Sequence, residues 1–151
     1  MKGVDNLLVR LSHCCNPVPG DEILGYITRG RGVSIHRANC RNIAYAVRIE
    51  PERLVEVAWD AEFVEPFQVK LEVNGLDRAG LLNDVMAVLK EMKISANWVT
   101  ARSKKDQNAV IDLVLETRGL DQLEFIMNKM GRIKDIHEIK RVSYGERSLE
   151  K

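Results

Sequence analysis

The sequence predicts an α+β protein built from two small modules, and three observations carry that prediction. All three cysteines of the 151-residue chain lie within its first 40 residues. Residues 60–66 are mildly acidic and contain a proline, which is typical of a short linker. After that linker, alternating and helical hydrophobic patterns follow one another in the order β-α-β-β-α-β.

The first module, residues 1–60, is expected to be rich in short strands. Asn39 is the expected N-cap of its helix, and Pro51 would end that helix. Two prolines and a glycine predict a turn at residues 16–21, and Gly30-Arg31-Gly32 predicts a hairpin. A strand so close to the N-terminus indicates a fragment excised from a longer protein. Strands are expected at residues 7–11, 23–27, 33–35 and 54–59, and a helix at 39–48.

The second module, residues 67–145, shows a more regular pattern, and residues 61–66 before it are the expected linker. The predicted order matches the ferredoxin-like fold. This fold serves many functions, so it does not indicate any particular one. Residues 146–151 are expected to form a tail. Strands are expected at residues 67–73, 94–102, 109–116 and 136–142, and helices at 81–89 and 120–130.

Composition excludes several classes of protein. Hydrophobic residues make up 45% and charged residues 30%, as in ordinary globular domains, and the net charge of +1 names no partner. The chain has no run of about 18 apolar residues, as a membrane-spanning helix requires, and its N-terminus does not resemble a signal peptide. We therefore expect a cytoplasmic protein with no membrane partner. Thiols stay reduced there, so an odd number of cysteines favours metal binding or catalysis over disulfides.

The cysteines and one histidine form a candidate metal site. Cys14 and Cys15 are adjacent, and His36 and Cys40 follow with the spacing of one helical turn. Zinc prefers four thiolate or imidazole ligands in a tetrahedron, and a site closed by four protein ligands is structural. Adjacent side chains point apart on an extended strand, so the backbone must bend after Cys15 to bring both sulfur atoms together.

Other interpretations of these residues stay open. Free cysteines often serve as small apolar core residues. A catalytic or redox cysteine is another alternative, with His13 beside Cys14 as a formal candidate for the base. His13 or Asp21 could also replace one of the metal ligands.

A basic stretch overlaps the candidate metal site. Residues 28–41 hold four arginines and no acidic residue. Arginine binds phosphate oxygens in a bidentate way, so a hairpin pinned by metal with a basic tip suits the backbone of a structured RNA. The alternative is a solvated basic turn. The lack of an aromatic cluster disfavours binding of single-stranded RNA by base stacking. The four residues are Arg29, Arg31, Arg37 and Arg41.

Residues 7–23, 25–37 and 39–40 closely resemble the conserved-cysteine, or zinc-finger, domain of long RelA/SpoT-family proteins. These are bacterial (p)ppGpp synthetases/hydrolases of the stringent response, the GTP pyrophosphokinase family. The resemblance implies a non-catalytic regulatory fragment that binds ribosomal RNA and uncharged tRNA and acts on catalytic domains upstream. It implies zinc as the structural metal, bound by Cys14, Cys15, His36 and Cys40.

Residues 67–144 are similar to an ACT domain, and residues 75–85 carry the resemblance, with Ala79 where these domains often have proline. The resemblance implies an amino-acid effector site at the loop before the first helix, where free N–H groups can receive a carboxylate. The alternatives are that the leucines are simply core residues and that the sheet edge serves homodimerisation. The implied site residues are Asp77, Arg78, Gly80, Leu81, Leu82, Asn83 and Asn97.

Catalytic motifs are missing from the sequence. It contains no P-loop, no Gly-x-Gly-x-x-Gly, and neither the His-Asp hydrolase motif nor the synthetase nucleotide site of the RelA/SpoT family. We therefore expect no enzymatic activity and no DNA partner. The main alternative function is an amino-acid sensor and dimerisation module, in which the cysteine module is only a spacer.

Overall fold

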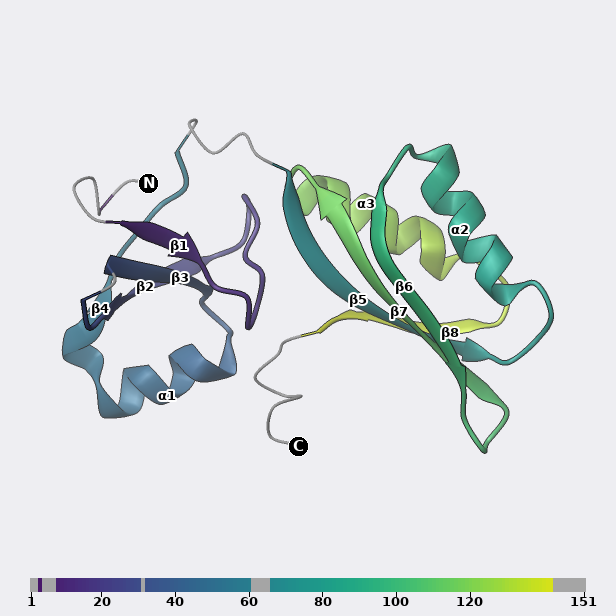
Figure 1. Cartoon of the computed structure of the whole chain (residues 1–151), viewed down its shortest axis with the longest axis horizontal. Helices are drawn as coiled ribbons and strands as arrows, with labels where there is room; N and C mark the ends of the chain where they lie inside the picture. The colour runs from purple at the N-terminus through teal and green to yellow at the C-terminus, as the bar shows by residue number, and fades with distance from the viewer. Residues whose placement is uncertain (1–2, 4–7, 31, 61–65, 143–151) are drawn as a thin grey trace. The chain divides into compact units, whose positions relative to one another are not determined.

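The computed structural model describes residues 3, 8–30, 32–60 and 66–142 (Figure 1). These residues divide into two compact units, one ending at Phe67 and the other spanning Gln68–Val142. Most of the predicted linker, residues 61–66, and the predicted tail, residues 146–151, lie outside the described residues. The structure confirms the α+β class, with a separate sheet in each unit.

A four-stranded sheet forms the first unit. It consists of β1 (Val9–Leu11), β2 (Ile23–Thr28), β3 (Gly32–Arg37) and β4 (Leu54–Val55), in the spatial order β1-β3-β2-β4. Strand β1 pairs with β3 in parallel, and β2 pairs with β3 and β4 in antiparallel (Figure 1).

The two faces of this sheet differ because successive side chains on a strand point to opposite sides. On one face, Val33 and Ile35 are fully buried among partly buried apolar side chains. Helix α1 (Arg41–Ile49) covers the other face with Ile43 and Ala46. Gly25 allows close packing on the first face, since a Cβ there would lie within 3 Å of the side chains of Val33 and Val55.

Two details of the first module differ from the sequence prediction. Helix α1 begins at Arg41 with Cys40 as its N-cap, so the prediction of Asn39 as the cap was wrong. The Cys40 side chain makes no capping hydrogen bond because its sulfur lies against Cys14 and His36. The expected strand at residues 54–59 is only two residues long, since the chain pairs with β2 at Leu54 and Val55 alone. A short 3₁₀ helix, η1 (Pro51–Arg53), connects α1 to β4.

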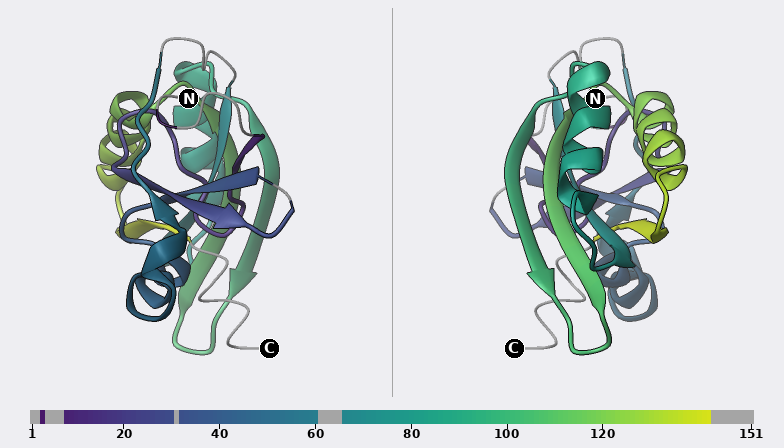
Figure 2. Two further views of the ribbon diagram at one scale, coloured as in Figure 1. Left: turned by 90° about the vertical axis from the view of Figure 1, so that its left-hand side faces the viewer. Right: turned by 90° about the vertical axis from the view of Figure 1, so that its right-hand side faces the viewer.

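The second unit confirms the ferredoxin-like prediction. Its sheet has the order β6-β7-β5-β8, and both helices lie on one side of it (Figures 1 and 2). Strand β6 starts two residues later than predicted because the chain reverses there, with Lys93 at a positive φ of 58°. The elements are β5 (Phe67–Leu76), α2 (Leu81–Glu91), β6 (Ala96–Ser103), β7 (Asn108–Thr117), α3 (Leu120–Gly131) and β8 (Ile136–Arg141).

The core of the second unit follows the alternation of its strands. Every second residue of β5 is buried from Phe67 to Gly75, and the residues between are more exposed. From α3, Leu123, Ile126 and Met130 are fully buried, which is the helical face that the sequence predicts. None of the helices in the described parts of the chain is long and apolar enough to cross a membrane.

Candidate metal centre

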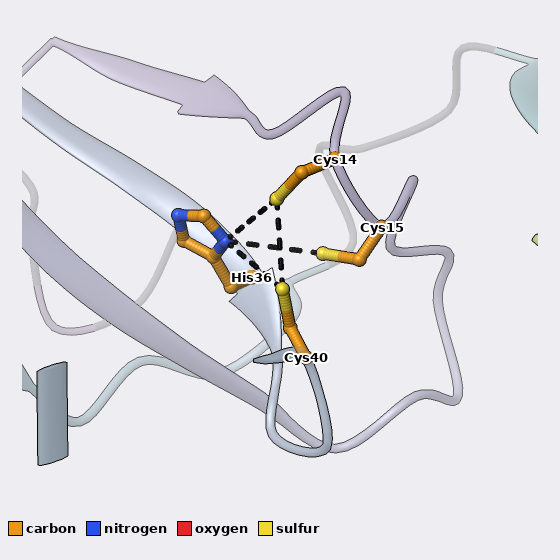
Figure 3. A group of neighbouring side chains, drawn as sticks. All are labelled: Cys14, Cys15, His36 and Cys40. Atoms are coloured by element: carbon orange, nitrogen blue, oxygen red, sulfur yellow. Dashed lines mark hydrogen bonds between the residues drawn. The ribbon is translucent and has the colours of Figure 1, made fainter. Parts of the chain in front are cut away.

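Four side chains from three segments of the first unit converge on one point (Figure 3). Cys14 and Cys15 lie in the turn after β1, His36 lies near the end of β3, and Cys40 precedes α1. Their ligand atoms all lie within 4.8 Å of one another. These are the four residues that the sequence predicts as ligands, and they lie close enough to hold a metal ion.

Four of the six distances between ligand atoms are close to those of a tetrahedral zinc site, and all six are within 4.8 Å. Zinc–sulfur bonds of about 2.3 Å and zinc–nitrogen bonds of about 2.0–2.1 Å give a tetrahedron with edges of about 3.5–3.8 Å. The Cys14 and Cys40 sulfur atoms are 3.5 Å apart. The Nδ1 atom of His36 lies 3.2, 3.9 and 3.7 Å from the sulfur atoms of Cys14, Cys15 and Cys40. The donor set and its size therefore suit zinc.

A tight turn makes the adjacent cysteines usable as a pair. Asn16 adopts the left-handed conformation, with φ of 46°, and its N–H donates to the Ser12 carbonyl over 3.0 Å. The chain therefore bends after Cys15, as the sequence analysis requires. The Arg37 N–H donates to the Cys15 sulfur over 3.2 Å, which ties the turn to the end of β3.

His36 is oriented by Ser34 on the same strand. Its Nδ1 faces the sulfur atoms (Figure 3). Its Nε2 lies 3.1 Å from the Ser34 hydroxyl. That hydroxyl donates in turn to the Tyr26 carbonyl over 3.5 Å. A second partner of this kind fixes the tautomer and ring direction of a metal-binding histidine. Sequence reasoning missed Ser34, although residues two apart on a strand share a face.

The cluster distributes its protons unevenly in the absence of a metal. Hydrogen bonds from Cys15 and Cys40 hold the pKa of Cys14 far below its usual value. The hydrogen bond to Cys14 raises the pKa of Cys15, because its ionisation would place a second thiolate beside the first. Burial opposes a charge on His36, but hydrogen bonds to Cys14 and Cys40 outweigh burial and raise its pKa to about 9. A bound metal would have to displace these protons.

The two substitute ligands considered from the sequence lie outside the cluster. His13 is exposed and is not among the clustered residues. The Asp21 carboxylate accepts a hydrogen bond of 2.9 Å from the Val18 N–H, and so supports the turn before β2.

The three predicted RNA-binding arginines that the structure describes lie near the two ends of β3. Arg29 is exposed in the β2–β3 hairpin, and Arg31 lies outside the described residues. Arg37 ends β3 and Arg41 begins α1, next to the metal cluster. The six residues of β3 separate these ends by about 17 Å. Arg29 therefore lies near the tip of a hairpin whose other end carries the metal cluster, whereas Arg37 and Arg41 lie beside the cluster, and RNA binding by these arginines stays a prediction.

The residues of the implied amino-acid site lie at the start of α2, but the structure does not bring all of them together. Asp77, Arg78, Leu81 and Leu82 line a small cavity of about 130 Å³ with residues of β6 and β7. The other three do not line it. Gly80 is the N-cap of α2, Asn83 is exposed, and Asn97 donates to the Glu116 carboxylate over 3.3 Å.

Arg78 is held within the second unit by acidic partners. Its guanidinium bonds to Asp135 at 2.9 Å and to Asp84 at 2.7 Å, and it donates to the Lys134 carbonyl over 2.9 Å. These contacts join the start of α2 to the loop before β8. An effector carboxylate would have to compete with two carboxylates for this side chain.

Comparison with known proteins identifies both modules. Residues 1–60 match the family model of the RelA/SpoT RIS domain, and residues 64–141 match that of the ACT domain. A GTP pyrophosphokinase of Haemophilus influenzae is 40% identical over 143 residues, and one of Escherichia coli is 36% identical over 143 residues. Each alignment covers 94% of this chain but 19% of the relative, so the chain spans about a fifth of their length.

Among solved structures, the ACT domain from the GTP pyrophosphokinase of Chlorobium tepidum is 18% identical. That match covers 52% of this chain and 100% of the other, with a TM-score of 0.47.

The fold and the cysteine cluster thus define a two-module protein that joins a candidate metal-binding module to an ACT domain. The chain belongs to the ACT-domain family through residues 64–141. With the RIS domain before it, it represents the C-terminal regulatory region of the RelA/SpoT family.

Proposed function

We propose that this chain is a non-catalytic, cytoplasmic regulatory region of a stringent-response (p)ppGpp synthetase/hydrolase. Its RIS domain binds the ribosome, through ribosomal RNA and uncharged tRNA. Together with the ACT domain, it relays translational or amino-acid status to catalytic domains upstream. The observation that carries this proposal is the convergence of Cys14, Cys15, His36 and Cys40 within 4.8 Å, in a chain that pairs a RIS with an ACT domain.

Zinc has a structural role in this proposal. Four protein ligands complete a tetrahedron and leave no position for a substrate. The ion would tie together the turn after β1, the end of β3 and the start of α1. Small modules build only a limited hydrophobic core, so such a link contributes directly to their folding.

The RNA contacts are assigned to Arg29, Arg31, Arg37 and Arg41. Arginine side chains at both ends of β3 suit the phosphates of a structured RNA better than one compact site, because phosphates repeat along the backbone. Such contacts supply affinity and orientation rather than sequence specificity.

Metal content tests the first part of the proposal. Protein purified without chelator is expected to carry about one zinc ion per chain by elemental analysis. Cys40→Ser should lose the zinc and unfold the RIS domain, whereas amide signals of the ACT domain should stay in place as an internal control. A metal-free protein with three titratable thiols and a folded RIS domain would remove the zinc site from the proposal.

Ribosome binding tests the second part. Removing charge with Arg29→Ala and Arg37→Ala should weaken ribosome binding and flatten its dependence on salt, because each lost phosphate contact lowers the salt slope by about one. Arg118→Ala, which removes an exposed arginine of the ACT domain, is the matched control. Equal binding by all variants would exclude the arginines as the RNA contacts.

A second function, amino-acid sensing with homodimerisation through the ACT domain, is favoured by the cavity of about 130 Å³ at the start of α2. Four of the seven residues named for such a site line this cavity. Calorimetry against the twenty amino acids tests it, and no heat with any of them would exclude sensing. Strand β6 is an edge of the ACT sheet, so sedimentation analysis of the oligomeric state tests the dimer.

A further inference from the structure

A second site lies in the RIS domain, between α1 and the sheet. A cavity of about 390 Å³ opens there beside the metal cluster. Its size falls within the range of about 300–1,000 Å³ that is usual for small-ligand sites. Cys14 and His36 of the metal cluster line one part of this cavity, but its other lining residues belong to neither the metal cluster nor the basic residues Arg29, Arg37 and Arg41.

The strand register explains which side chains line the cavity. Arg10 of β1 pairs with Ser34 of β3, and Ser34 pairs with Tyr26 of β2, so these three form a row across the sheet. Because alternate residues share a face, Thr28 lies on the same side as Tyr26. All four line the cavity below α1, so this face of the sheet is polar where the opposite face is apolar.

Helix α1 supplies the other wall. Ile43 and Ala46 are buried and form an apolar floor. Asn42 and Tyr45 stand at the rim and are exposed, with 56% of the Tyr45 surface accessible. The acidic lining residue, Glu50, is engaged by the Tyr26 hydroxyl at 2.7 Å and by Arg53 at 3.4 Å. Its charge is therefore already paired.

These groups match the parts of one nucleotide. An apolar floor and an exposed tyrosine ring suit the face of a base, and stacking on an aromatic ring accepts any base. The Asn42 amide can donate to and accept from a base edge. The hydroxyls of Thr28 and Ser34 donate to backbone carbonyls, so they can still accept hydrogen bonds from the sugar hydroxyls. The exposed Arg10 guanidinium suits the phosphate.

We propose that the cavity between α1 and the β1-β3-β2 face binds one nucleotide, with the base against Tyr45 and the phosphate at Arg10. The nucleotide could come from an unpaired residue of a structured RNA or from a free mononucleotide. The RNA source rests on the proposed ribosome-binding function and adds a contact to a base, whereas the mononucleotide source is independent of that function.

The first experiment titrates the zinc-loaded chain with AMP, GMP, CMP and UMP and follows the amide signals. The expected result is shifts confined to β1, β2, β3 and α1, the elements that line the cavity. Tyr45→Ala should weaken binding about fivefold to a hundredfold, as lost stacking of a base does. Val47→Ala, on the same helix but outside the cavity, should bind like wild type. Arg10→Ala should weaken binding of the mononucleotides but leave the nucleosides unaffected.

The second experiment compares two RNA hairpins that differ by one bulged residue. Preference for the bulged hairpin that disappears in Tyr45→Ala assigns the cavity to an RNA residue, and binding of mononucleotides alone assigns it to a free nucleotide. Either result supports the proposal. No binding of mononucleotides and no preference for the bulge would overturn it, as would a Tyr45→Ala variant that binds both like wild type.

The two proposals fail separately. Ribosome binding that depends on Arg29 and Arg37 but not on Tyr45, with no nucleotide bound, leaves the proposed function and removes the cavity proposal. If Tyr45→Ala loses mononucleotide binding and the wild-type chain does not bind the ribosome, the cavity proposal stands and the proposed function is removed.

Discussion

Replacing Ser34 by alanine should weaken zinc binding without removing any ligand. The Ser34 hydroxyl lies 3.1 Å from Nε2 of His36, and both side chains are buried. With zinc at Nδ1, the Nε2–H donates to this hydroxyl, which donates onward to the Tyr26 carbonyl. Loss of the hydroxyl leaves the imidazole free to rotate away from the ion and leaves a buried N–H without its acceptor.

The size of the effect follows from the position of Ser34. Removing an outer partner of a metal-binding histidine typically lowers metal affinity about tenfold to a hundredfold. Ser34 also lines the cavity below α1, so a water molecule can take the place of its hydroxyl. We therefore expect the lower end of the range, about tenfold, which corresponds to about 1.4 kcal/mol.

Competition with a chromophoric zinc chelator at neutral pH measures this affinity. Thr28→Val is the matched control, because it removes a hydroxyl from the same face of the sheet. The Thr28 hydroxyl donates to the Gly32 carbonyl and not to His36. Its zinc affinity should equal that of wild type. Equal affinities for Ser34→Ala and wild type would refute the argument that Ser34 orients His36, and an equal loss in both variants would indicate a general weakening of the sheet.

Three further predictions follow from the structure. Zinc affinity should rise between pH 6.5 and about 9, because His36 holds a proton up to its raised pKa of about 9 and zinc must displace that proton. The same proton stabilises the metal-free fold fully below pH 6.5, and this stabilisation is lost as the pH rises to about 9. A zinc affinity that does not change with pH in chelator competition would contradict the role of the His36 proton. Gly32→Ala should lower the free energy of unfolding of the RIS domain by about 1–3 kcal/mol in denaturant titrations, since a Cβ would meet the Leu8 carbonyl oxygen. Gly30→Ala is the control: Gly30 has a similar φ but no atoms near its Cβ position, so this variant should lose less stability. Leu123→Ala should cost the ACT domain about 2–5 kcal/mol by calorimetry and leave zinc affinity unchanged, because Leu123 is fully buried in the other unit.

The clustering of the candidate metal ligands was predictable because their chemistry is rare and their pairs are local in the chain. Few combinations of residues offer three thiols and an imidazole, and the spacing from His36 to Cys40 places both near one helix start. The supporting residues were harder to find. Serine is common and carries no comparable signal, so Ser34 stands out only once its hydroxyl is seen beside Nε2 of His36.

Helix ends and strand lengths were predicted less well because contacts with distant segments set them. Asn39 has the better capping side chain, yet Cys40 occupies the N-cap position because its sulfur belongs to the cluster. The predicted strand at 54–59 kept its alternating pattern, and Val57 still packs against the Ile35 cluster. Pairing with β2 nonetheless ends at Val55, which alternation along one strand does not reveal.

Periodicity alone determined the βαββαβ order of the second module and its buried helix face, because each depends on neighbours along the chain. Residue chemistry made Cys14, Cys15, His36 and Cys40 candidate ligands. The parallel pairing of β1 with β3, the separation of Arg29 from Arg37 and the cavity under α1 depend on which strands lie side by side. Strands of similar composition can pair in several orders, and the free-energy differences between those orders arise from packing between distant segments. That information is present only in the folded molecule.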